Sequence, residues 1–138
     1  MPLFLLTAAG ALGLDLAINA AVDAWLPYRV AVLGSFAGLE RTFNPGVAFG
    51  VRFPPVLQAV LIGVALCLVL TVGLRSVDTV LSRIGYGLIA GGAVANILDR
   101  IVDGVVTDYI QVGTFPVFNA ADSCITIGAF VLLAEAWF

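Results

Sequence analysis

Two aspartates in the C-terminal third of the sequence, Asp108 and Asp122, are close enough along the chain for a short connection to bring them together. Asp108 has β-branched and aromatic neighbours in the stretch Val105–Ile110, and burial among such residues raises the pKa of a carboxyl group. Two carboxyl groups a few ångströms apart share a proton, so that one activates a water molecule while the other protonates a leaving group. The pair therefore predicts metal-free hydrolysis of an amide bond.

The composition excludes most other catalytic devices. The 138-residue chain contains no His, and all six of its basic residues are Arg. Ser-His-Asp and Cys-His catalysis, His-ligated zinc, Schiff-base lysines and Walker-type phosphate loops are therefore excluded. Cys67 and Cys124 lie in apolar runs without metal-ligand spacing. We expect neither a metal ion nor a cofactor. The net charge of −3 gives no basic patch for nucleic acid.

Hydrophobic residues make up 62% of the chain and charged residues 11%, against about 45–50% and about 25% in soluble domains. This composition predicts a membrane protein. Four apolar stretches have about the 20 residues that a helix needs to cross the ~30 Å hydrocarbon layer. We expect a single all-α membrane domain over residues 1–138 with four transmembrane helices, at about 3–22, 55–74, 80–98 and 119–138.

Two long connections, 23–54 and 99–118, lie on the same side of the membrane when all four stretches span it. In the first of them, the β-branched and aromatic stretch Tyr28–Phe36 predicts a short strand or hairpin at the membrane surface. Arginines occur in both long connections and also around 75–83, so charge counting leaves the orientation open. The side with the long connections collects most of the polar residues, and with them the candidate chemistry.

Polar residues also border the last two spans. Asn96 and Asp99 share one face of the third span because they are three residues apart, and Arg100 follows; this pattern is also typical of a helix end anchored at the membrane interface. At the fourth span, Asn119 suits the N-cap position and Asp122 completes a capping-box pattern. That structural role competes with a catalytic one, although an aspartate one turn inside an apolar helix normally faces a protein cavity.

Two further candidates lie in the N-terminal half. In the stretch Arg41–Gly50, Asn44 and Gly46 belong to an Asn-Pro-Gly turn, in which the asparagine can bond neighbouring backbone or a substrate peptide. Asp15 lies deep in the first span, where it either contacts Asn19 one helical turn away or belongs to an active site. The residues alone leave both interpretations of Asp15 open.

Four stretches, taken in order, resemble the bacterial lipoprotein signal peptidases, also called signal peptidase II. The first two are an Asn-x-Gly-small-small-aromatic segment at Asn44–Phe49 and a Gly-Gly-Ala…Asn-x-x-Asp-Arg segment at Gly91–Arg100. The other two are a Val-x-Asp-aromatic segment at Val106–Tyr109 and a Phe-Asn-x-Ala-Asp-Ser segment at Phe118–Ser123. Their order and spacing, together with the four-span layout, extend the resemblance over nearly the whole chain.

The four-span layout agrees with the resemblance, which implies that the β-like segment and surface loop expected between the first two spans are extracytoplasmic. It implies that Asp108 and Asp122 are the catalytic pair of an aspartic endopeptidase. The residues it implies for substrate binding or support of the site are Asp15, Asn44, Gly46, Asn96, Asp99, Arg100 and Asn119. The implied substrate is a diacylglyceryl-modified prolipoprotein in the bacterial cytoplasmic (inner) membrane, cleaved just before the lipidated cysteine.

The resemblance also implies cytoplasmic termini, a site in contact with membrane lipid on the extracytoplasmic side, and inhibition by cyclic peptides of the globomycin type. The sequence departs from the family pattern at Leu16 and Asn19, which replace the usual Gln and Lys, and at Ala95 and Tyr109. The alternative is a small helix bundle that binds lipoproteins without cleaving them or conducts ions. The loop position of Asp108 argues against conduction, and the intact aspartate pair argues against binding alone.

Overall fold

The computed structural model describes residues 1–46, 54–75 and 79–137. The helices within these residues are α1 Pro2–Trp25, α2 Pro55–Arg75, α3 Val80–Asp103 and α4 Ala120–Trp137. All four are long and apolar enough to cross a membrane, as the apolar runs of the sequence require. The expected class, an all-α multi-pass membrane protein with a small β segment, is confirmed.

Helices α1 and α3 run further than apolarity alone predicts. We expected the first span to end near residue 22 and the third near residue 98, whereas the helices continue to Trp25 and Asp103. The additional turns carry polar residues such as Asp23 and Arg100. A span defined by apolar residues stops before them, although the backbone remains helical. The extension places Asp99 and Arg100 within α3, facing the elements that follow it.

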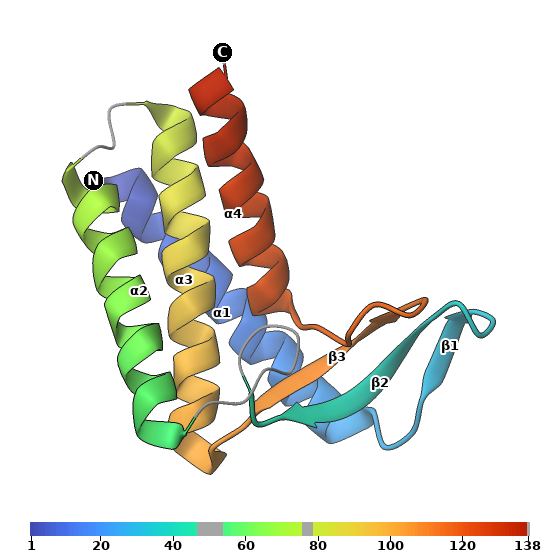
Figure 1. Ribbon diagram of the computed structural model, residues 1–138. Helices are drawn as coiled ribbons and strands as arrows, with labels where there is room; N and C mark the ends of the chain where they lie inside the picture. The colour runs from blue at the N-terminus through green and yellow to red at the C-terminus, as the bar shows by residue number, and fades with distance from the viewer. Residues whose placement is uncertain (47–53, 76–78, 138) are drawn as a thin grey trace.

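Helix α3 lies between α2 and α4, with α1 behind it, and packs most extensively against α1 and α4 (Figure 1). Small residues make these contacts close. A Cβ atom on Gly91 would lie 2.3 Å from the carbonyl oxygen of Ala8 in α1, and one on Gly92 would lie 2.5 Å from the carbonyl oxygen of Ala121 in α4. Because backbone meets backbone at these positions, the two glycines set the separation of the three helices.

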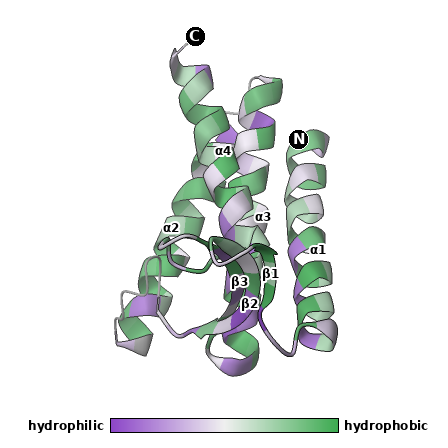
Figure 2. Cartoon of the chain, turned by 90° about the vertical axis from the view of Figure 1, so that its right-hand side faces the viewer, coloured by the Kyte–Doolittle hydropathy of each residue, from purple (hydrophilic) through white to green (hydrophobic). Residues whose placement is uncertain are grey.

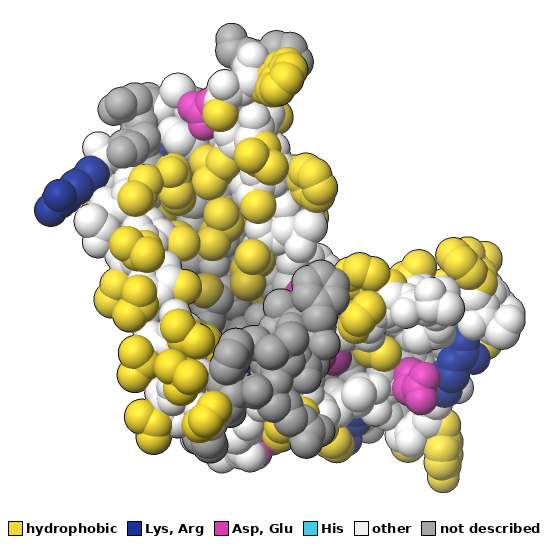
Figure 3. Space-filling model, in the orientation of Figure 1, with side chains coloured by type: hydrophobic (Ala, Val, Ile, Leu, Met, Phe, Trp, Pro, Cys, Tyr) yellow, Lys and Arg dark blue, Asp and Glu magenta, His cyan; other side chains and the backbone are white. Residues whose placement is uncertain are grey.

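The outer surface of the bundle is apolar. Figure 3 shows hydrophobic side chains spread over the helices that face the viewer. Helix α2 is the least enclosed of the four, and side chains such as Val60, Val64 and Leu68 are more than half exposed. Apolar area costs about 25 cal/mol per Å² in contact with water, but lipid tails are as apolar as these side chains. The exposed face of α2 therefore fits a lipid environment.

A three-stranded antiparallel sheet projects from the bundle at the end opposite to both termini (Figure 1). Its strands, in the order β1-β2-β3, are β1 Val30–Leu33, β2 Ala37–Asn44 and β3 Val106–Val112. The hairpin expected within Tyr28–Phe36 is present as β1 and the turn after it, but β2 continues to Asn44, and β3 was not expected. The pairing of β2 with β3 places Thr42 opposite Asp108.

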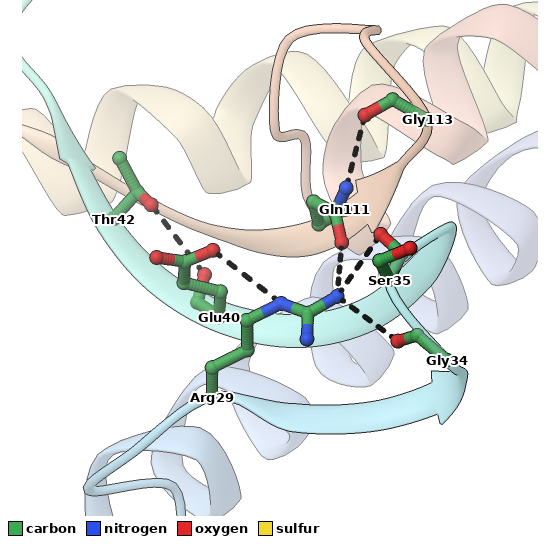
Figure 4. A network of polar contacts seen from close by, with 7 residues as sticks. All are labelled: Arg29, Gly34, Ser35, Glu40, Thr42, Gln111 and Gly113. Carbon is green, nitrogen blue, oxygen red and sulfur yellow. Dashed lines mark hydrogen bonds and ion pairs between the residues drawn. The ribbon is translucent and has the colours of Figure 1, made fainter.

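A polar network on the sheet fastens the hairpin (Figure 4). The Arg29 guanidinium donates to the backbone carbonyls of Gly34 and Ser35 and to the side-chain oxygen of Gln111, which lies 2.9 Å away in β3. The Glu40 carboxylate of β2 lies 3.9 Å from the same guanidinium. One arginine thus joins the turn after β1 to β2 and β3, so the projecting hairpin keeps a fixed relation to the strand that carries Asp108.

Hydrophilic residues gather where the sheet meets the helices (Figure 2). Near the end of α1, Asp23 pairs with Arg41 of β2 at 2.7 Å, and the Arg41 guanidinium lies 4.8 Å from the centre of the Phe43 ring. This end of the molecule can therefore hold a polar site at the membrane boundary.

Replacement of Gly91 by Ala should lower the melting temperature, because the added methyl group would meet the Ala8 carbonyl oxygen at 2.3 Å. Overpacking of this kind costs about 1–3 kcal/mol. Gly10→Ala in α1 is the matched control, since nothing lies within 4 Å of its added Cβ, and it should be neutral or slightly stabilising. Thermal unfolding in detergent checks both variants, and equal melting temperatures would contradict the close approach of α1 and α3.

Candidate functional site

The site is built around the N-terminus of α4, which starts inside the protein. The first N–H groups of a helix have no intrahelical partner and need one in an apolar environment. Asn119 is the N-cap, and its Oδ1 accepts a hydrogen bond from the backbone N–H of Asp122 at 2.7 Å. The Tyr109 hydroxyl accepts one from the backbone N–H of Ala120 at 2.9 Å. The N-cap predicted at Asn119 is confirmed, and both capping side chains are buried.

Asp15 supplies a third cap from α1. Its Oδ1 accepts from the backbone N–H of Ala121 at 2.8 Å, and its Oδ2 accepts from Nδ2 of Asn19 at 3.2 Å. The same Asn19 amide donates to Asp99 of α3 at 3.1 Å, and Asp99 accepts from the backbone N–H of Thr107 at 3.3 Å. The predicted contact of Asp15 with Asn19 is therefore present, and it belongs to a network that joins α1, α3, β3 and α4.

Asp108 lies on β3 with its side chain directed inward, and the residue is only 2% exposed. Its Oδ1 accepts from Nδ2 of Asn119 and its Oδ2 from Nδ2 of Asn44, both at 3.1 Å. Burial is the main cause that raises the pKa of Asp108 to about 6; the Asn44 hydrogen bond opposes the rise and the charge of Asp122 adds to it. A carboxyl group with this pKa can hold or release a proton near neutral pH.

Asp122 lies in the first turn of α4. Its Oδ1 accepts from Nδ2 of Asn96 at 2.8 Å. Oδ1 of Asn96 accepts in turn from Nδ2 of Asn119 at 3.0 Å, and this Asn119 amide also donates to Asp108. The two aspartates are thus connected through side-chain amides. Because these direct partners are neutral, they orient the carboxyl oxygens without supplying a positive charge of their own.

The Asn44–Gly46 turn lies next to the pair. Oδ1 of Asn44 accepts from the backbone N–H of Gly46 at 2.9 Å. Arg100 donates from Nη2 to the Gly46 carbonyl at 2.6 Å and from Nη1 to the Asn96 carbonyl at 3.0 Å. Its Nε is buried and has no hydrogen-bond partner among the described residues. Arg100 therefore ties the turn to α3. The rest of the Asn44–Phe49 motif falls on residues 47–49, outside the described residues.

A cavity of about 840 Å³ opens beside the two aspartates. Its polar end is formed by Asn44, Asn96, Arg100, Asp108 and Asp122. Most of its remaining wall is apolar and comes from α2, α3, α4 and the connection before α4, with Ile62, Leu66, Ile89, Phe118 and Ile125 among the lining residues. A cavity that combines a large apolar wall with a few convergent polar groups is typical of a ligand-binding site. Within residues 1–46, 54–75 and 79–137, no cluster of three or more His, Cys, Asp or Glu side chains could hold a metal ion.

Five of the nine sequence-predicted residues line this cavity, namely Asn44, Asn96, Arg100, Asp108 and Asp122. The other four, Asp15, Gly46, Asp99 and Asn119, do not line it, and their hydrogen bonds join the elements that form it. Sequence reasoning missed the capping role of the Tyr109 hydroxyl. It also missed Gln58, whose Nε2 donates to the Pro45 carbonyl at 3.4 Å. The sequence does indicate Gln58 in one way: it is a single glutamine in an apolar span, where burying a polar side chain costs free energy.

Comparison with known proteins identifies the family. The family model described as signal peptidase (SPase) II matches residues 7–138. A lipoprotein signal peptidase of Allorhizobium ampelinum is 42% identical over 133 residues, which cover 88% of this chain and 80% of that protein. A lipoprotein signal peptidase of Mesorhizobium japonicum is 35% identical over 140 residues, which cover 96% of this chain and 83% of that protein.

Solved structures share the fold. A structure described as a bacterial membrane enzyme has a TM-score of 0.87 and 22% identity, and the match covers 97% of this chain and 87% of that one. A second structure with the same description has a TM-score of 0.84, and the match covers 96% and 91%. At this identity the two structures show the fold alone, whereas the family model and the curated relatives show the family. The chain belongs to the signal peptidase II family.

Proposed function

We propose that this protein is an aspartic endopeptidase that removes the signal peptide from diacylglyceryl-modified prolipoproteins and cleaves just before the lipidated cysteine. Membership of the family makes it a peptidase of the lipoprotein signal peptidase type. One observation supports the finer assignment most directly. Asp108 and Asp122 line one cavity and are connected to each other through the side-chain amides of Asn96 and Asn119.

In the proposed reaction the two carboxyl groups share one proton. The ionised carboxylate takes a proton from a water molecule as the water oxygen attacks the scissile carbonyl carbon. The protonated carboxyl then donates its proton to the amide nitrogen as the C–N bond breaks, and the pair again holds one proton. The apolar wall of the cavity would contact the acyl chains, and its polar end would contact the peptide around the cleavage site.

We infer that the sheet faces the extracytoplasmic side of the bacterial inner membrane and that both termini are cytoplasmic. Both termini lie at the end of the bundle opposite the sheet (Figure 1). A substrate anchored by its lipid presents its cleavage site near the extracytoplasmic surface of the inner membrane. Asp108 lies on β3, in the sheet that we place on this side. Globomycin-type cyclic peptides would bind in the same cavity and compete with the substrate.

Asp108→Asn and Asp122→Asn should each lower the cleavage rate by at least about 100-fold, because general acid–base catalysis contributes about 10²–10⁴ in rate. The assay follows the size shift of a diacylglyceryl-modified prolipoprotein on a gel, with the protein in nanodiscs and a parallel reaction in EDTA. Asp103→Asn is the matched control, since Asp103 is exposed at the end of α3 and does not line the cavity.

Cleavage that survives either site substitution would contradict the aspartate pair. Loss of cleavage in EDTA would contradict a metal-free mechanism. A well-folded parent protein that cleaves nothing would instead favour the non-catalytic or ion-conducting bundle.

The pH profile of kcat/KM should fall on the alkaline side of about pH 6. The pKa of Asp108 is raised to about 6, chiefly by burial, so above this pH the free enzyme loses the proton that the pair must donate. The fall should be about tenfold per pH unit. Initial rates at low substrate concentration between about pH 4 and 9 test this, and a profile that is flat from about pH 5 to 8 would exclude Asp108 as a carrier of the shared proton.

Asp108 should also make stability depend on pH. Its pKa rises on folding from 3.8 to about 6, so the folded state favours the protonated form. This stabilisation is complete below about pH 4 and is lost as the pH rises through about 6. At about 1.4 kcal/mol per pKa unit the effect is at most about 3 kcal/mol. The melting temperature of the parent, relative to that of Asp108→Asn, should fall between about pH 4 and 7, whereas a constant difference would contradict the raised pKa.

A further inference from the structure

Gln58 is a buried polar residue in the first turn of α2, a helix whose only charged residue is Arg75 at the opposite end. The residue is 7% exposed, and its Nε2 donates to the carbonyl oxygen of Pro45 at 3.4 Å. A buried side-chain amide needs a hydrogen-bond partner. The contact with Pro45 therefore fixes the direction of the Gln58 side chain.

The Asn44–Gly46 turn is held from two helices at consecutive carbonyl groups. Gln58 of α2 donates to the carbonyl of Pro45, and Arg100 of α3 donates to the carbonyl of Gly46 at 2.6 Å. Inside the turn, Oδ1 of Asn44 is occupied by the backbone N–H of Gly46, which leaves Nδ2 to donate to Asp108 at 3.1 Å. A continuous series of contacts thus runs from α2 through the turn to the aspartate.

We propose that Gln58 is a positioning residue of the peptidase site. Its side chain holds the Pro45 carbonyl, and the Asn44 amide is thereby directed at Asp108. Gln58 is not among the described residues that line the cavity, so it acts through Asn44 and not on the substrate. The inference rests on the proposed function, because its effect on cleavage requires that Asp108 takes part in the reaction.

The position of Gln58 on α2 links the turn to the apolar part of the cavity. Ile62, Leu66 and Val69 line the cavity and follow Gln58 at intervals of three or four residues, so all four lie on one face of the helix. A substrate that fills the cavity contacts the same helix face that holds the turn. Loss of the Gln58 donor leaves the apolar wall in place, and it should therefore lower kcat more than it raises KM.

The pH profile separates positioning from packing. The charged groups that act on Asp108 are Asp122 from α4 and Arg100 and Asp99 from α3, and a neutral substitution at Gln58 changes none of them. The Asn44 hydrogen bond lowers the pKa of Asp108 and so opposes the effect of burial. If the turn loosens and this bond is lost, the pKa rises and the alkaline limb of kcat/KM moves to higher pH.

The test uses Gln58→Met, which keeps the side-chain length and removes the donor. We expect kcat to fall about tenfold, as expected for the loss of a hydrogen bond that orients a reacting group, and the alkaline limb to move to higher pH. Asn44→Ala should move the limb in the same direction, and the double variant should move it no further, because Gln58 acts through Asn44. Leu57→Met is the control, since Leu57 is the exposed neighbour of Gln58 on α2, and it should keep the parent rate and profile.

A Gln58→Met protein with the parent pH profile, or a double variant whose shifts add, would overturn the proposal. The pH at which kcat/KM falls depends only on the folded, active molecules, so a lower yield of folded protein does not change it. If Gln58→Met does not fold, Gln58→Asn takes its place, because it withdraws the amide from Pro45 by one methylene group. Failure of the proposed function would look different. In that case the Asp108→Asn variant would still cleave the prolipoprotein, or the parent protein would not cleave it.

Discussion

A helix that begins inside an apolar layer must satisfy its first N–H groups without bulk water, and the start of α4 meets this requirement with side chains from several elements. Tyr109 of β3, Asp15 of α1 and the N-cap Asn119 each accept one of these N–H groups. Each group left without a partner in lipid would cost several kcal/mol. The caps hold α4 against β3 and α1, and β3 and α4 carry the two candidate carboxyl groups. The need to cap α4 therefore also brings Asp108 and Asp122 to one cavity.

Asn119 shows how the structural and chemical requirements are met by one side chain. Its Oδ1 caps the helix, and its Nδ2 donates to both Asp108 and Asn96. In the sequence, a helix cap and a catalytic site were competing interpretations of the stretch around Asn119 and Asp122. In the structure the cap uses only the backbone N–H of Asp122, while the carboxylate of Asp122 accepts a hydrogen bond from Asn96. The stretch can therefore both cap the helix and supply a catalytic carboxylate. A side chain with one acceptor oxygen and two N–H donors is suited to this double use.

Local patterns predicted the helices because the thickness of a membrane and the need to pair every backbone group leave few alternatives for an apolar run of about 20 residues. They also pointed to Asp108 and Asp122. Strand β3 was not predicted, since its stability depends on pairing with β2, which is far away in the sequence. The contact between Asp15 and Ala121 joins the first helix to the fourth, and no local pattern records it. Gln58 looked like one residue of an apolar span because its partner, Pro45, lies across a connection.

The capping of α4 also has a consequence for how the protein matures in the membrane. The chain is made from its N-terminus, so α1, α3 and β3 are synthesised before α4. At that stage Asp15 and Tyr109 have no helix end to cap, and Asp108 has neither Asn119 nor the second aspartate beside it. The arrival of residues 119–122 completes the caps and the carboxyl pair in the same step. The candidate site is therefore incomplete in the nascent chain until residues 119–122 have joined it.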